Sequence, residues 1–136
     1  MKKIIFLQIL IISILTSCSK YEDGPSLSLR SKKARLCGEW KIEFVSQDGI
    51  DITTDVLTAL GSENEFHIEK DGTYHVHGLS EDMGTWELKD KKESLLTQSN
   101  TAGSEAEDFT ILKLENDALW LKHVHEDGTF IYHYKQ

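Results

Sequence analysis

The segment EWKIEF, residues 39–44, alternates charged and apolar side chains without a break. Trp40, Ile42 and Phe44 fall on one side of an extended chain, and the charged residues fall on the other. Successive side chains of a strand point to opposite faces, so this spacing predicts a strand with one buried face. We expect all three apolar residues to face the core of a β-sheet domain.

Seven further runs of this kind follow and predict an all-β protein of about eight short antiparallel strands, at the spacing of a sandwich or a barrel. The pairs Asp48-Gly49, Asp71-Gly72 and Asp127-Gly128 each come after such a run and favour the tight turns of hairpins. The runs are EFHIE, TYHVH, GTWELK, ESLLTQ, EDFTILKL, ALWLKHV and TFIYHYK.

One segment, TTDVLTALG at residues 53–61, departs from the alternating pattern. Val56, Leu57 and Leu60 share one face of a helix, a threonine is available to cap its start, and Gly61 is available to end it. We expect one short helix here, packed on one end of the sheet.

The first 17 residues have the composition of a secretory signal. Lys2 and Lys3 precede an apolar stretch at residues 4–15, which is shorter than the about 20 residues of a membrane-spanning helix. An uncut membrane anchor is therefore the weaker alternative. The sequence LTSC at residues 15–18 resembles the lipobox of bacterial lipoproteins, in which cleavage exposes a cysteine that is then lipidated. The resemblance implies a signal peptide over residues 1–17 and a lipid on Cys18.

Residues 18–35 are expected to form a lipidated tether. They hold the only proline, several serines and few apolar side chains, so they cannot bury a core. The acidic pair Glu22-Asp23 resembles a signal that sends some lipoproteins to the outer face of the outer membrane. We therefore expect an outer-membrane lipoprotein of the cell envelope, periplasmic or surface-exposed. With Cys18 lipidated, Cys37 has no partner cysteine, and we expect a buried or half-buried thiol.

Residues 36–136 provide 101 positions, enough for one domain with one core. This part carries 8 lysines, no arginine and 21 acidic residues, a net charge of −13. A surface of that sign repels the phosphate backbone, so nucleic acid is excluded as a partner. We interpret the acidity as a source of solubility rather than as a site for a cationic ligand.

Four short motifs occur in the order found in the small lipocalin-like lipoproteins of Gram-negative bacteria. The resemblance implies an eight-stranded antiparallel up-and-down lipocalin-like barrel over residues 36–136, with one short helix after the first strand. It also implies that Trp40 plugs one end of the barrel. The motifs are G-x-W at Gly38 and Trp40, F-x-x-x-x-D-G-T-Y at residues 66–74, G-T-W-x-L at residues 84–88 and F-x-I-x-x-L at residues 109–114.

A histidine cluster is predicted on the hairpin that Asp71-Gly72 turns. If residues 70–72 form a three-residue loop, His67 lies opposite His75 and Glu65 lies opposite His77, while Phe66, Ile68, Tyr74 and Val76 fill the core face. The outward set of His67, His75, His77 and Glu65 has the ligand types of a transition-metal site. We interpret it as a solvated polar face, with metal binding as the alternative.

The last hairpin places apolar residues on both of its faces. We expect Leu119, Leu121 and His123 to share one face with Ile131 and His133, and Trp120, Val124, Phe130, Tyr132 and Tyr134 to share the other. If the leucine face is inside, the two histidines are polar groups in an apolar interior. That arrangement fits either a ligand pocket or two buried histidines bonded to neighbours.

Two functions remain open for the barrel. The first is a module that binds a small apolar or amphipathic ligand, and the second is a non-enzymatic scaffold whose barrel is filled and whose outer face docks a partner. No G-x-S-x-G, H-E-x-x-H or phosphate-binding glycine loop is present, so we expect neither enzymatic activity nor a cofactor. The expected ligand-binding residues are Trp40, Tyr74, Val76, Trp86, His123 and His133.

Overall fold

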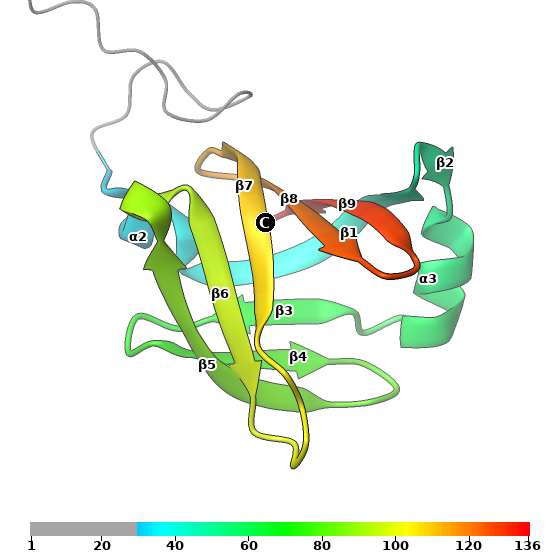
Figure 1. Ribbon diagram of the computed structural model, residues 1–136, viewed down its shortest axis with the longest axis horizontal. Coiled ribbons are helices and arrows are strands. Elements are labelled where there is room, and N and C mark those ends of the chain that lie inside the picture. Colours follow the sequence, from blue (N-terminus) through cyan, green and yellow to red (C-terminus); the bar gives the residue numbers. More distant parts are fainter. Residues whose placement is uncertain (1–29) are drawn as a thin grey trace, which may run out of the picture.

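Eight antiparallel strands close into an up-and-down barrel in the computed structural model, which describes residues 30–136 (Figure 1). Each long strand pairs with the next, and β1 also pairs with β9, which closes the sheet and confirms the predicted fold class. The predicted signal peptide and Cys18 lie outside the described residues. The strands are β1 (Gly38–Gln47), β3 (Glu65–Ile68), β4 (Thr73–His77), β5 (Asp82–Lys89), β6 (Ser94–Ser99), β7 (Glu107–Leu114), β8 (Ala118–His125) and β9 (Gly128–Lys135), with a two-residue extension, β2 (Ile50–Asp51), paired to the end of β1.

Short helices lie at the two ends of the barrel. Helix α2 (Lys32–Leu36) and the 3-10 turn η1 (Asp90–Lys92) lie at one end, and α3 (Thr53–Leu60) lies at the other (Figure 1). Within residues 30–136, no helix is long and apolar enough to cross a membrane.

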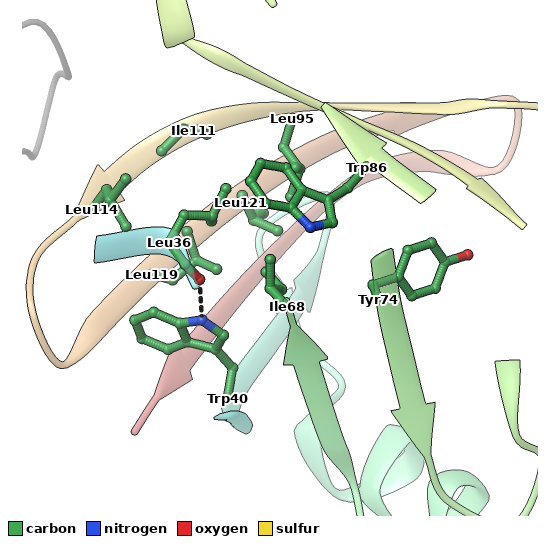
Figure 2. Close-up of a cluster of buried hydrophobic side chains, with 10 residues drawn as sticks. All are labelled: Leu36, Trp40, Ile68, Tyr74, Trp86, Leu95, Ile111, Leu114, Leu119 and Leu121. Carbon is green, nitrogen blue, oxygen red and sulfur yellow. Dashed lines mark hydrogen bonds between the residues drawn. The ribbon is translucent and has the colours of Figure 1, made fainter. Parts of the chain in front are cut away.

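Helix α2 seals its end of the barrel with buried side chains. Leu36 and Trp40 are both 0% exposed, and the Trp40 indole Nε1 donates a hydrogen bond of 2.8 Å to the Leu36 carbonyl (Figure 2). Arg35 is also buried, and its Nη1 donates to the Leu114 carbonyl at 2.7 Å. The folded unit therefore includes residues 32–35, which the sequence analysis assigned to the tether.

The hydrophobic core fills the half of the barrel next to α2. Trp86 is 7% exposed and donates its Nε1 proton to the Glu69 carbonyl at 2.9 Å, so its polar atom is satisfied inside the core. The prediction that Trp40, Trp86 and Tyr74 face the interior is confirmed. The cluster consists of Leu36, Trp40, Ile68, Tyr74, Trp86, Leu95, Ile111, Leu114, Leu119 and Leu121 (Figure 2).

A β-bulge changes the inward face of β1 halfway along the strand. The pairing of β1 with β9 shifts register between Ile42 and Phe44. Beyond the shift Val45 is 0% exposed, while Phe44 lies against the ring of His133 at 4.9 Å between centroids. The expectation that Phe44 shares the core face of Trp40 is therefore wrong, because the extra residue of a bulge reverses the alternation that follows it.

The hairpin of β3 and β4 has the predicted register. Glu65 pairs with His77 and His67 pairs with His75. Gly72 adopts a φ of 92°, a conformation that glycine reaches without a steric penalty. The neighbouring Asp71 carboxylate accepts hydrogen bonds from the Thr73 backbone and hydroxyl, which lower the pKa of Asp71 below its usual value. The turn is thus fixed by local bonds on both sides of the glycine.

Helix α3 occupies the predicted segment but starts differently from the prediction. Ile52 is the N-cap residue and makes no side-chain capping bond. The hydroxyl of Thr53 instead accepts from the Val45 backbone at 2.9 Å and donates to the Asp51 carboxylate at 2.6 Å, which ties the helix to β1. Gly61 ends the helix, as predicted, with a φ of 82°.

Candidate functional site

A pocket of about 350 Å³ opens at the α3 end of the barrel. Its walls come from all eight strands of the barrel and from Val56 and Leu60 of α3, whose apolar face turns toward the interior. The apolar and aromatic lining residues are Ile42, Val45, Val56, Leu60, Phe66, Tyr74, Val76, Phe109, Leu121, Phe130, Tyr132 and Tyr134. The polar ones are Asn64, Glu65, His77, Asp82, Thr97, Glu107 and His123. The volume and the mostly apolar lining are typical of a site for a small molecule.

Three of the six expected ligand-binding residues line this pocket, and three, including His133, do not. Tyr74, Val76 and His123 belong to its wall. Trp40 and Trp86 lie inside the packed core next to α2 and are absent from the lining, so the expectation that a ligand touches them is not supported. Their indole protons are used by backbone carbonyls, which makes both tryptophans parts of the closed end of the barrel.

The face assignment of the last hairpin needs a correction. His125 pairs with Gly128 across a two-residue loop, so Leu121 pairs with Tyr132 and His123 pairs with Phe130. Paired residues share a face, and the tyrosines and Phe130 therefore point inward beside the leucines. His133 points outward and stacks on Trp120 at 4.0 Å between centroids, with 6° between the ring planes. The expected role of His133 in the pocket is wrong for this reason.

Aromatic rings that the sequence analysis placed on the outer face make up much of the pocket wall. Tyr132, Tyr134 and Phe130 all line it, and Phe109 contacts both His123 and Tyr132, at 4.8 and 6.4 Å between centroids. The length of the loop is the sequence feature that could have placed these residues correctly. A two-residue loop of Glu126 and Asp127 pairs His125 with Gly128, which puts Phe130, Tyr132 and Tyr134 on the same face as the leucines.

Acidic groups surround the mouth of the pocket. The hydroxyl of Tyr74 donates to the Asp82 carboxylate at 2.7 Å, and the hydroxyl of Ser99 donates to the same carboxylate at 2.5 Å. Burial raises the pKa of the Tyr74 phenol, and the adjacent Asp82 raises it further. Glu107 also lines the pocket, and its charge adds to the effect of burial in raising the pKa of Tyr132. The phenols are therefore neutral hydrogen-bonding groups, and the carboxylates supply negative charge.

A second, polar hollow of about 570 Å³ adjoins the apolar pocket. The two share Asp82, Thr97, Glu107 and His123. The remaining lining of the second hollow includes Glu81, Glu105 and His125. An amphipathic molecule that places its apolar part among the aromatic rings would thus leave its polar end in an acidic, hydrated recess.

The histidine cluster forms on the outer face of the β3–β4 hairpin, with one change from the predicted set. His67 Nε2 lies 3.1 Å from the Glu65 carboxylate, as an interaction within that strand. His75 and His77 instead lie next to each other, 3.8 Å between ring centroids, and both face Glu81. Glu81 was missed because it lies in the loop after β4, where the sequence pattern gives no register.

Cys37 is a half-buried free thiol, as expected, between α2 and β1. Burial raises the pKa of the thiol, although the charge of Lys33 opposes this effect. A raised pKa leaves little thiolate at neutral pH, so this cysteine is a poor nucleophile.

Comparison with solved structures identifies the architecture. A crystal structure of a lipocalin-like protein from Bacteroides uniformis ATCC 8492 matches with a TM-score of 0.55 and 15% sequence identity, over 75% of this chain and 98% of that chain. The fold is lipocalin-like. No protein-family model and no curated protein matches the sequence. A barrel of eight strands has an interior just wide enough for its own side chains or one small ligand.

Proposed function

We propose that this protein is a membrane-anchored lipoprotein whose lipocalin-like barrel binds one small amphipathic molecule at the α3 end. The observation that supports the binding role is the apolar pocket of about 350 Å³ beside a polar hollow, at the end that α2 does not seal. Binding sites for small molecules combine an apolar wall with a few polar groups that fix orientation. Tyr74, Asp82, Glu107 and His123 supply those groups here.

The charge at the mouth selects the head group of this ligand. Glu65, Asp82 and Glu107 all line the pocket, and no lysine or arginine of residues 30–136 lines either hollow. A carboxylate or phosphate brought to this recess would meet like charges, which disfavour it strongly where water is partly excluded. We therefore expect a ligand with an apolar body and a neutral or cationic head.

The membrane anchor rests on the lipobox alone. Substitution Cys18→Ala should abolish incorporation of radiolabelled palmitate and release the protein from the membrane fraction. Acylation that persists in this variant would contradict the lipoprotein assignment, without bearing on the pocket. An anchor at Cys18 would place the barrel at a membrane of the cell envelope, the outer membrane by our proposal.

The binding role is tested with two surfactants that share a ten-carbon chain. Decyltrimethylammonium should bind with saturable one-to-one stoichiometry in calorimetry below its micelle concentration, and decanoate should bind at least tenfold more weakly. Substitution Val76→Trp should abolish both interactions, because Val76 lines the pocket and the larger side chain fills it. Tighter binding of decanoate would contradict the charge argument, and no saturable binding of either would contradict the binding role.

A scaffold that docks a protein partner is the alternative, and exposed apolar side chains favour it. Ile50, Leu79 and Val124 are 69%, 77% and 69% exposed, and they lie on β2, on the loop after β4 and on β8. Substitution Leu79→Ser would then disturb the cellular role of the protein, while the pocket-filling Val76→Trp would leave it intact. The binding module predicts the reverse.

A further inference from the structure

A pair of histidines and a glutamate converge on the outer face of the β4–β5 hairpin. His75 and His77 are two positions apart on β4 and therefore point to the same face of the sheet. Glu81 precedes β5 and lies 4.0 Å from His75 Nε2 and 3.9 Å from His77 Nδ1. One ligand atom from each residue lies within 4.8 Å of the other two.

One atom of this group is left without a partner. His75 Nε2 is buried and has no hydrogen-bond partner within residues 30–136. A buried ring nitrogen without a partner carries a desolvation cost that a ligand for it would remove. The Glu81 carboxylate faces this nitrogen, but its oxygen, 4.0 Å away, is too distant for a hydrogen bond.

The loop that carries Glu81 is held in place by the adjacent helix. The backbone N–H of Leu79 donates to the carbonyl of Leu60, the last residue of α3, at 2.8 Å. A Cβ at Gly78 would lie 2.9 Å from the same carbonyl, so the close approach requires glycine. Glu81 itself is 67% exposed and free to rotate toward the histidines, while the loop backbone is fixed.

We propose that His75, His77 and Glu81 form a binding site for a divalent transition metal, with Zn²⁺ the best match. Two imidazoles and one carboxylate are a known donor set for zinc sites that keep an open fourth position. Bonds of 2.0 to 2.2 Å in tetrahedral geometry place ligand atoms about 3.3 Å apart. The three ligand atoms lie within 4.8 Å of one another, so they need to approach by up to roughly 1.5 Å, and the exposed side chain of Glu81 is free to supply part of that movement.

The neighbouring His67 is excluded from this site by its own contacts. Its Nε2 is bonded to Glu65, and its Nδ1 lies 3.8 Å from Glu39. The ligand set is thus distinct from the set of His67, His75 and His77 that the sequence suggested. His77 also lines the apolar pocket and Glu81 the polar hollow, so a bound metal ion would lie at the edge of the proposed site for an amphipathic molecule.

Titration of the full chain with zinc alone in a calorimeter tests the proposal. The wild-type protein should bind one zinc ion. His75→Gln, His77→Gln and Glu81→Gln should each weaken zinc binding about tenfold or more, because loss of a direct ligand should cost at least as much affinity as loss of a residue that only supports a ligand. The matched control His67→Gln, on the same face of the same hairpin, should change the affinity less than twofold.

Two results would overturn the site. Absence of zinc binding by the wild-type protein is the first. The second is binding that survives Glu81→Gln and disappears with His67→Gln, which would return the metal to the predicted set of three histidines. Glu81 is exposed in a loop, so Glu81→Gln leaves the fold intact and its result cannot be attributed to unfolding.

Discussion

The two ends of the barrel use aromatic residues in opposite ways. At the α2 end, Trp40 and Trp86 are packed among leucines and give their indole protons to backbone carbonyls. At the α3 end, Phe109, Phe130 and Tyr132 surround an open space of about 350 Å³. Aromatic side chains thus close one end of the barrel and line a site at the other. The difference is the amount of unfilled space around them.

This difference follows from how each end is covered. Leu36 of α2 inserts directly over Trp40, and the two side chains are 0% exposed. Helix α3 lies beside the opposite end and contributes only Val56 and Leu60 to the wall. A short helix with two buried side chains completes the packing of the first end, whereas α3, which has none, leaves space at the second. The following predictions test whether this division into a closed end and an open end is correct.

Loss of the first-strand tryptophan should have the largest effect. Trp40→Ala removes a fully buried indole and leaves the Leu36 carbonyl without its donor, so we expect the free energy of unfolding to fall by about 3 to 5 kcal/mol. Trp120→Ala is the matched control, because Trp120 lies on the outer face against His133 and Lys113. We expect Trp120→Ala to lower the free energy of unfolding by about 1 kcal/mol. Urea unfolding measures both, and equal losses would remove the distinction between core and surface tryptophan.

Substituting tryptophan for a smaller residue should affect the stability of the two ends differently. Ile111→Trp overpacks the closed end, where Ile111 is 3% exposed, and should cost about 1 to 3 kcal/mol of stability. Val76→Trp at the open end enters existing space and should cost about 1 kcal/mol or less, while it abolishes surfactant binding. Urea unfolding and calorimetry check the pair. A stability loss at Val76 as large as that at Ile111 would show that the open end is as densely packed as the closed one.

Removal of one hydroxyl at the pocket mouth should have a smaller effect. Tyr74→Phe deletes the hydrogen bond to Asp82, but Ser99 still donates to that carboxylate. We expect a loss of about 1 kcal/mol in urea unfolding, with the barrel intact. A loss above about 3 kcal/mol would mean that this bond is part of the core and not of the rim.

The protein should lose stability at alkaline pH, because phenols at the open end ionise there, and its stability should not change with their ionisation near neutral pH. The pKa values of Tyr74, Tyr132 and Tyr134 are raised in the folded state, chiefly by burial. The unfolded chain releases these protons near its ordinary pKa of about 10, so stability is complete below that pH and falls as the pH rises above it. Absorbance at 295 nm in a pH titration should show these phenols ionising only well above pH 10. Ionisation at the ordinary pKa would contradict their burial.

The sequence predicted the barrel better than it predicted the site. Strand number, the α3 segment and the β3–β4 register follow from alternation and from the Asp-Gly turn, which are local signals. The bulge before Phe44 and the two-residue loop before Gly128 each shift the alternation of side chains by one residue. The residues beyond each point therefore face the opposite side of the sheet from the one expected. Neither leaves a trace in the alternating pattern. His133 and the inward tyrosines were misassigned for this reason.

A second group of site features depends on contacts between distant segments. Glu81 reaches the histidines because Leu79 is bonded to the end of α3, 19 residues earlier in the chain. The placement of Trp40 in a sealed core depends on α2, a five-residue helix whose first four residues were assigned to the tether from composition. Short helices and loops of this kind are stabilised by the rest of the fold and not by their own sequence.

The central claim is that a ligand enters the open end and leaves the closed end untouched, and one nuclear magnetic resonance titration tests it directly. Decyltrimethylammonium should shift the methyl signals of Val45, Val76 and Leu60, which line the pocket, in a saturable manner. The indole N–H signals of Trp40 and Trp86, bonded inside the core, should remain unchanged throughout. Shifts confined to the indole signals, or no saturable shift of the pocket methyl signals, would contradict the account.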